Sequence, residues 1–300
     1  MLKIIIKAYL EHMRRGMDTT DQKRIAGQNP PEGIDTICDI PYLNDGKKEH
    51  LLDIYYPTGT REPLPIVIDI HGGGLFYGYK EINKYYNMCI AARGFTVFSI
   101  NYSLVPKTYV VQQLSEVLSA FRWIAAHGGE YPADRNRVFL TGDSAGGFLA
   151  LYSGMINKSP KLQERFELEG SSLQIKALGL TSGMFYTQSD FGDKSMKYLR
   201  QVIYPRKYKK SSYFSYLEPG ELLREGKGLP TYLVTSAEDF IQEHSRRLAQ
   251  ELEKQKIPCM LHDFPKGETE LGHVFSVINP FGTEGEQVID EMTAWFRKWQ

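Results

Sequence analysis

The sequence predicts an α/β fold in which a mostly parallel central sheet is flanked by helices and carries a helical cap. Short apolar runs alternate with helical patterns along the chain, which is typical of parallel strands joined by crossover helices. The sequence shows no internal repeat and no low-complexity linker. Three hundred residues with 42% hydrophobic content can fill one large core. We therefore expect a single domain over residues 1–300.

Each expected element follows from its own pattern. Residues 65–70 (PIVIDI) are β-branched with few polar breaks, as in a strand that is buried on both faces. Residues 111–126 have the spacing of an amphipathic helix. The other expected strands cover residues 51–56, 95–102, 137–141, 175–180, 231–235 and 260–264. The other expected helices cover residues 145–156, 242–255 and 286–299.

Two segments interrupt this alternation and are the candidates for the cap. Residues 1–34 precede the first expected strand and contain a helical pattern over 2–17. Residues 185–228 separate two consecutive expected strands, which is long for a plain loop. Lids and binding loops are the usual reason for such insertions, and a surface excursion without a function is the alternative.

The second cap segment is rich in aromatic residues. Nine of the 32 residues from 185 to 216 are aromatic, against 12% in the whole chain. They are Phe185, Tyr186, Phe191, Tyr198, Tyr204, Tyr208, Tyr213, Phe214 and Tyr216. Such rings offer large apolar faces with few rotamers to freeze. We expect this segment and the N-terminal helix to close a pocket for small substrates.

Charge and cysteine content exclude several classes of protein. The 36 basic and 36 acidic residues balance, so no overall field attracts nucleic acid or an anionic membrane. Cys38, Cys89 and Cys259 are too scattered for a metal site or a disulfide scaffold. No stretch reaches the roughly 18 apolar residues of a membrane span, and the apolar run at residues 4–6 is too short for a signal peptide. We expect a cytoplasmic protein without nucleic-acid or membrane partners; its oligomeric state stays open, a homodimer included.

The pentapeptide at residues 142–146 (GDSAG) fits the pattern G-x-S-x-G. In that pattern a sharp turn between a strand and a helix presents a serine hydroxyl above the edge of the sheet. Glycines on either side avoid clashes at the turn. Here the motif falls between the apolar run 138–140 and a helix that is rich in small residues. Ser144 is therefore the candidate nucleophile.

A second glycine-rich motif, residues 71–74 (HGGG), directly follows the expected strand 65–70. Backbone N–H groups without side chains around them can turn toward one point, where a carbonyl oxygen gains negative charge during acyl transfer. A glycine-rich β-turn and a phosphate-binding loop are the alternatives. The phosphate-binding patterns G-K-[ST] and G-x-G-x-x-G are not completed here.

With these motifs the sequence resembles the hormone-sensitive-lipase-like branch of the α/β-hydrolases, the family of HGGG and GDSAGG esterases. Residues 71–74 and 142–147 match the two hallmark motifs. Residues 101–106 (NYSLVP) are similar to the family's Tyr-Arg-Leu-Ala-Pro-Glu segment, but Ser103 and Lys107 replace its Arg and Glu, which removes any ion pair there. The resemblance runs from about residue 50 to residue 300.

The resemblance implies the α/β-hydrolase fold and a catalytic triad in the chain order serine, acid, histidine. Among the seven histidines, only His273 lies in a loop after an expected strand and just before the final helix, although Val274 stands where the family has Gly or Ala. Asp239 matches the family's aspartate at the end of the strand 231–235. Glu238 is the second candidate for the acid and Asp263 the third. A helix N-cap is the structural alternative for Asp239.

The resemblance also implies the reaction. His273 accepts the proton of Ser144, and the N–H groups of Gly73, Gly74 and Ala145 form the oxyanion hole. We expect a serine carboxylesterase acting on small, short-acyl esters, and we expect no metal or organic cofactor. An amidase, a formamidase or a small peptidase would use the same machinery. A non-catalytic ligand-binding relative is the third alternative, against which the presence of a histidine at position 273 argues.

Overall fold

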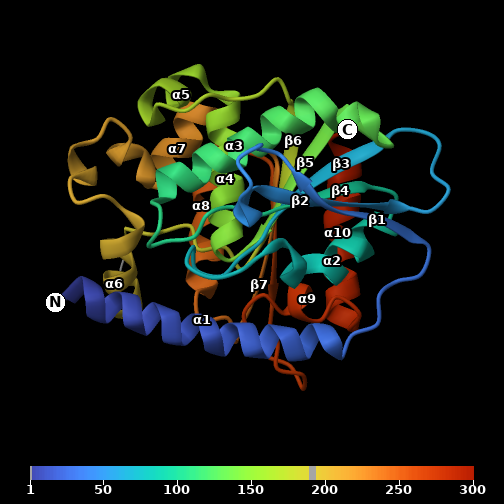
Figure 1. Cartoon of the computed structure of the whole chain (residues 1–300), viewed down its shortest axis with the longest axis horizontal. Coiled ribbons are helices and arrows are strands. Elements are labelled where there is room, and N and C mark those ends of the chain that lie inside the picture. Colours follow the sequence, from blue (N-terminus) through green and yellow to red (C-terminus); the bar gives the residue numbers. More distant parts are fainter. Residues whose placement is uncertain (1, 189–193) are drawn as a thin grey trace.

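The computed structural model describes residues 2–188 and 194–300 (Figure 1). Within these residues eight strands form one sheet in the order β1-β2-β4-β3-β5-β6-β7-β8. The strands are β1 (Ile34–Pro41), β2 (Leu51–Pro57), β3 (Leu64–Ile70), β4 (Thr96–Ile100), β5 (Ala133–Asp143), β6 (Ile175–Thr181), β7 (Thr231–Ser236) and β8 (Cys259–Phe264). β1 and β4 both pair antiparallel with β2, and the remaining pairs are parallel. The predicted α/β fold with a mostly parallel sheet is confirmed.

The seven predicted strands correspond to β2–β8 within a few residues, but β1 was not predicted. β1 begins at Ile34, so the prediction that residues 1–34 precede the sheet agrees with the structure to within one residue. β1 is an edge strand with few buried side chains, and its register with β2 shifts between Ile37 and Ile40. Such a bulge interrupts the alternation of apolar and polar residues by which a strand is recognised.

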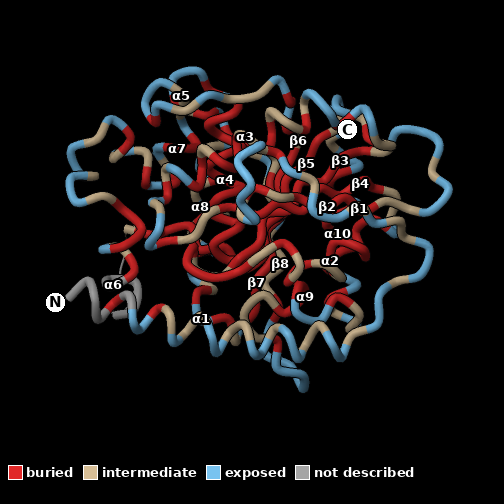
Figure 2. Tube along the Cα trace, viewed as in Figure 1, coloured by how far each residue is buried: buried red, intermediate tan, exposed pale blue. Residues whose placement is uncertain are grey.

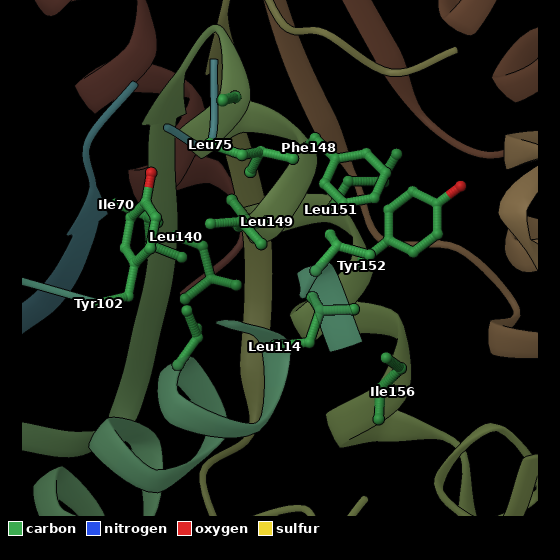
Figure 3. Close-up of a cluster of buried hydrophobic side chains, with 14 of the residues drawn as sticks. Ile70, Leu75, Tyr102, Leu114, Leu140, Phe148, Leu149, Leu151, Tyr152 and Ile156 are labelled. Carbon is green, nitrogen blue, oxygen red and sulfur yellow. The ribbon is translucent and has the colours of Figure 1, made fainter. Parts of the chain in front are cut away.

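Helices cover both faces of the sheet and bury two cores. Side chains from alternate positions of each strand point to opposite faces, so Ile66 and Ile68 of β3 enter the first core and Val67 enters the second. The first core is covered by α3 (Val110–His127), α4 (Ala145–Lys158) and α8 (Gln242–Lys254). The second is covered by α2 (Lys84–Ala91) and α10 (Thr283–Lys298). Figure 2 shows that the buried residues lie in the centre of the molecule. Figure 3 shows part of the first core around Leu140 of β5.

The remaining helices also contribute side chains to the two cores. They are α1 (Leu2–Ala26), α5 (Pro160–Phe166), α6 (Lys194–Ile203), α7 (Pro219–Gly226) and α9 (Phe275–Ile278). The helix predicted for residues 2–17 continues through Ala26. None of the helices in the described part of the chain combines the length and the apolar character that a membrane crossing requires.

Helix α1 lies across the loops that follow β3 and β4, at the carboxyl edge of the parallel strands (Figure 1). The Arg14 guanidinium donates to the carbonyl oxygen of Phe76 at 2.9 and 2.7 Å and to that of Val105 at 3.2 Å. Tyr77 and Tyr79 donate their hydroxyl protons to Asp21 and Asp18 of the helix, each at 2.9 Å. The N-terminal helix therefore covers the loop that contains the HGGG motif.

The aromatic segment after β6 packs mainly against the protein itself. Phe185, Tyr186, Tyr204 and Tyr213 are buried. The rings of Tyr204 and Tyr208 stack with centroids 4.5 Å apart. Phe191 lies outside the described residues, and so does the side chain of Tyr198. The aromatic enrichment in the described part of the segment thus serves packing to a large extent.

Candidate active site

Ser144 stands at the sharp turn between β5 and α4 with φ 51° and ψ −116°. This left-handed φ is strained for a residue with a side chain, so the surroundings must hold it in place. Its N–H donates to the Thr181 carbonyl oxygen at 2.9 Å, and its carbonyl oxygen accepts the Met184 N–H at 2.8 Å. A Cβ on Gly146 would collide with the Ile70 carbonyl oxygen, and one on Gly142 would lie 2.5 Å from the Gly146 carbonyl oxygen. The spacing of the G-x-S-x-G motif follows from these close approaches.

The structure brings the three predicted triad side chains together. Ser144 Oγ lies 2.9 Å from His273 Nε2, and His273 Nδ1 lies 2.7 Å from Asp239 Oδ1. His273 comes from the loop after β8 and Asp239 from the loop after β7, so strand ends on one edge of the sheet supply all three groups. Among the described residues, no hydrogen bond joins Glu238 to His273, and Asp263 pairs instead with Arg246 at 2.6 Å.

The buried Asp239 carboxylate is held by several donors. Thr235 Oγ1 donates to Oδ2 at 2.9 Å, and the Ile241 N–H donates to Oδ1 at 3.0 Å. Burial by itself would raise the pKa of Asp239, but the hydrogen bond and charge of His273 and the Ile241 N–H outweigh burial and lower that pKa below its ordinary value. An ionised Asp239 keeps the imidazole proton on Nδ1. Nε2 is then free to accept the proton of the Ser144 hydroxyl.

The loop after β3 contains Gly73 and Gly74, two of the three residues predicted to form the oxyanion hole. Gly73 and Gly74 have φ of 101° and 61°, which favour glycine, and a Cβ on Gly73 would collide with the Tyr77 carbonyl oxygen. The Gly73 carbonyl oxygen accepts the N–H groups of Phe76 and Tyr77 at 3.1 and 2.9 Å, which closes the loop. Within the described residues, no hydrogen bond uses the N–H of Gly73, Gly74 or Ala145. These three donors remain open to a ligand.

His71, the first residue of the HGGG motif, is buried and supports the loop. Its Nδ1 lies 2.8 Å from the Gly72 carbonyl oxygen, and its ring stacks on Tyr102 at 4.3 Å. The Tyr102 hydroxyl donates to the His71 carbonyl oxygen at 2.8 Å. Burial lowers the pKa of His71 to about 4, so this side chain is neutral at pH 7.

A buried polar cluster beneath the loop was not predicted from the sequence. Asp143 accepts the Gly72 N–H at 3.0 Å and the Asn83 side-chain amide at 2.8 Å. The same amide lies 3.2 Å from Asp69 Oδ2, which also accepts from Asn87 at 2.8 Å. Burial, with the Asp143 charge adding to it, raises the pKa of Asp69 to about 7. The sequence contains one indication of this cluster, which is Asp69, the single acidic residue inside the apolar strand PIVIDI.

The family model described as BD-FAE matches residues 52–204, just over half of the chain. The chain belongs to the BD-FAE family. This result confirms the resemblance to α/β-hydrolase esterases on which the sequence prediction was based. The matched region contains the HGGG loop and the nucleophile elbow, whereas Asp239 and His273 lie beyond it.

Curated relatives of this BD-FAE protein are esterases that share part of its length. Esterase LipC of Mycobacterium tuberculosis is 30% identical over 48% of this chain and 35% of its own length. The isoprenylcysteine alpha-carbonyl methylesterase ICME of Arabidopsis thaliana is 28% identical over 44% of this chain and 31% of its own length. This chain thus spans about a third of these relatives. The R526 protein of Acanthamoeba polyphaga mimivirus, whose name places it among the alpha/beta hydrolases, is 26% identical over 86% of this chain and 75% of its own length.

Solved esterases share the fold of this BD-FAE protein. Esterase B from Lactobacillus rhamnosis superposes with a TM-score of 0.93 at 24% identity and covers 98% of this chain and 95–96% of its own, depending on the crystal structure. The esterase of the archaeon Pyrobaculum calidifontis superposes with a TM-score of 0.75 at 18% identity and covers 96% of this chain and 93% of its own. At these identities the likeness establishes the α/β-hydrolase fold.

Proposed function

We propose that this protein is a serine carboxylesterase that hydrolyses small, short-acyl carboxylic esters through an acyl-enzyme on Ser144. The observation that carries the proposal is the continuous chain of hydrogen bonds from Ser144 Oγ through His273 to Asp239, at 2.9 and 2.7 Å. A nucleophile, a base and an orienting acid in this order are the parts that acyl transfer requires. The esterase activity named for the relatives supports the same reaction.

In the proposed mechanism, Ser144 Oγ attacks the ester carbonyl carbon while His273 Nε2 accepts its proton. Asp239 stabilises the imidazolium that forms. The carbonyl oxygen becomes an oxyanion and accepts the N–H groups of Gly73, Gly74 and Ala145, each of which lowers the barrier by about 3–4 kcal/mol. Ala145 is the first residue of α4, so the positive end of the helix dipole adds to this stabilisation.

The first half of the cycle ends when the alcohol leaves, and the second half repeats the same steps with water as the nucleophile. The tetrahedral intermediate collapses, the bond between the carbonyl carbon and the alcohol oxygen breaks, and His273 gives its proton to the leaving alcohol. A water molecule then loses a proton to His273 and attacks the acyl-enzyme, which releases the acid and restores the Ser144 hydroxyl. These steps use side chains and backbone groups of this chain alone.

We propose acyl chains from acetyl to about hexanoyl as the preferred substrates. Two observations support this range. Helix α1 lies across the loop that carries the oxyanion donors, and the segment after β6 begins beside Ser144, which favours an enclosed site. The similar esterase B was solved in a form inhibited by a C4–C4 tributyrin phosphonate. The balanced charge supports small-molecule substrates, without nucleic-acid or membrane partners. The three scattered cysteines support a reducing compartment such as the cytoplasm.

Two measurements test the proposal. Labelling with a fluorophosphonate should modify the wild-type protein and leave Ser144→Ala unlabelled. The value of kcat/KM should be highest between two and about six acyl carbons across p-nitrophenyl esters, and it should exceed that for the matching p-nitroanilides. A maximum at ten carbons or more would contradict the short-acyl proposal, and faster cleavage of the anilides would make the protein an amidase.

A further inference from the structure

Phe240 is an exposed aromatic residue beside the triad. It directly follows Asp239 in the chain, and 73% of its surface is exposed although both of its neighbours are buried. Its ring centroid lies 4.4 Å from that of the His273 imidazole, with the planes tilted by 48°. Burial of a phenylalanine ring is strongly favourable, so a bound ligand that covers the exposed Phe240 ring would gain binding free energy.

Other large hydrophobic residues of the described chain are also exposed, but none of them makes a ring contact with His273. Tyr9, Tyr109, Met260 and Ile278 are between 37% and 51% exposed. Single exposed hydrophobic residues of this kind are common on protein surfaces and need no explanation. Phe240 differs from them both in its greater exposure and in its contact with the imidazole that moves the proton.

The chemistry fixes where the alcohol portion of an ester must lie. His273 has to deliver a proton to the leaving alcohol oxygen, so this oxygen comes within about 2.6–3.2 Å of Nε2. The opposite nitrogen, Nδ1, is occupied by Asp239. The carbon atoms attached to the alcohol oxygen therefore extend from the Nε2 side of the imidazole. Because the Phe240 ring centroid lies only 4.4 Å from that of the imidazole, these atoms come within a few ångströms of the Phe240 ring. The acyl chain is attached to Ser144 and leaves the reacting carbon in another direction.

We propose that Phe240 is a specificity-determining residue that binds the alcohol portion of the substrate, and that the enzyme favours esters of arylalkyl alcohols over those of small aliphatic alcohols. An aromatic ring of the substrate in tilted or offset contact with the Phe240 ring gains binding free energy in addition to that from the apolar area that the two rings bury. The inference rests on the proposed esterase function and adds to it the class of leaving group. A ring that only shields His273 would affect all esters to the same degree.

The test compares esters that differ in the alcohol portion alone. The value of kcat/KM is measured for ethyl, cyclohexylmethyl and benzyl butyrate with the wild type and with Phe240→Ala, Phe240→Leu and the control Met260→Ala. We expect the benzyl-to-ethyl ratio to fall about tenfold in Phe240→Ala and less in Phe240→Leu, which keeps an apolar side chain. The ratio of benzyl to cyclohexylmethyl should fall in both Phe240 variants. Met260→Ala should keep the wild-type ratios.

A second measurement examines how the enzyme binds an alcohol in the second half-reaction, when the alcohol attacks the acyl-enzyme. When benzyl alcohol is added during hydrolysis of p-nitrophenyl butyrate, its oxygen bonds to the acyl carbon, the bond to Ser144 Oγ breaks, and the alcohol proton passes through His273 to Ser144. The fraction of butyryl groups recovered as benzyl butyrate should fall in Phe240→Ala. Methanol as acceptor should show little change in that fraction.

The outcomes separate the two proposals. Unchanged ratios in both Phe240 variants, or an equal loss for every ester and acceptor, would overturn the role of Phe240 while leaving the esterase function intact. If the wild type cleaves none of these butyrates faster than Ser144→Ala does, the proposed function itself fails. Phe240→Leu keeps the test informative where Phe240→Ala does not fold.

Discussion

Replacing Asp69 by Asn should make the protein less sensitive to alkaline pH. The pKa of Asp69 is raised to about 7, because the group is buried and lies near the Asp143 charge, whereas an aspartate in an unfolded chain has a pKa of about 3.9. Between these values the folded protein keeps a proton that the unfolded chain has lost. The stability contributed by protonated Asp69 is therefore complete below about pH 4 and is lost as the pH rises through about 7.

The magnitude follows from the two pKa values. Three pH units at about 1.4 kcal/mol each give a cost of about 4 kcal/mol for ionised Asp69 at alkaline pH. Asparagine has a similar shape and does not ionise, so it avoids this cost. About one of these three units is already lost by pH 5, so the free energy of unfolding of Asp69→Asn, minus that of the wild type, should rise by about 3 kcal/mol from pH 5 to pH 8.5.

Urea unfolding followed by far-UV circular dichroism at several pH values measures this difference. Asp290→Asn, on the exposed side of α10, is the matched control and should change the pH dependence far less. A difference between Asp69→Asn and wild type that stays constant within about 1 kcal/mol over the range would refute the reasoning. It would mean that Asp69 is already ionised at pH 5 in the folded protein.

Three further predictions concern the triad and the oxyanion loop. Ser144→Ala should keep less than about a thousandth of the wild-type kcat with an unchanged circular dichroism spectrum, since only binding and oxyanion donors remain; greater residual turnover would exclude Ser144 as the nucleophile. Asp239→Asn should lower kcat far more than Glu238→Gln, because only Asp239 bonds to the base; the reverse order in a p-nitrophenyl butyrate assay would contradict the acid assignment. Gly73→Ala should lower kcat at least about a hundredfold, because the added methyl group collides with the Tyr77 carbonyl oxygen and moves an oxyanion donor; near-normal kcat would show that the Gly73 N–H is not such a donor.

The parts of the site that could be predicted from the sequence are those in which the backbone imposes a residue type. At Gly142 and Gly146 a side chain would strike other backbone atoms, and at Gly73 the φ angle favours glycine. The backbone geometry therefore requires the glycines by which each motif is recognised in the sequence. Asp239 and His273 are not marked by such motifs. They could be selected because the fold places strand ends on one edge of the sheet, and the position of each residue after a strand was recognisable.

Other features could not be predicted, because their cause lies in contacts between distant segments. Asn83 bridges Asp69 and Asp143, which come from different strands, and nothing near Asn83 in the sequence indicates either partner. Helix α2 is short and follows a 3-10 turn, so its apolar pattern has too few residues to stand out. Phe240 reads as an ordinary hydrophobic residue until the structure shows its ring exposed beside His273.

The hydrogen bond between the Met184 N–H and the Ser144 carbonyl oxygen has a consequence for directed evolution. The segment after β6 is one of the two predicted cap segments, and it begins with a hydrogen bond to the backbone of Ser144, the proposed nucleophile. Gly183 has no room for a side chain, because an added Cβ would strike the ring of Phe185. Mutant libraries intended to alter substrate preference should therefore keep residues 182–185 fixed and place their diversity farther along the segment, where sequence change does not displace the serine.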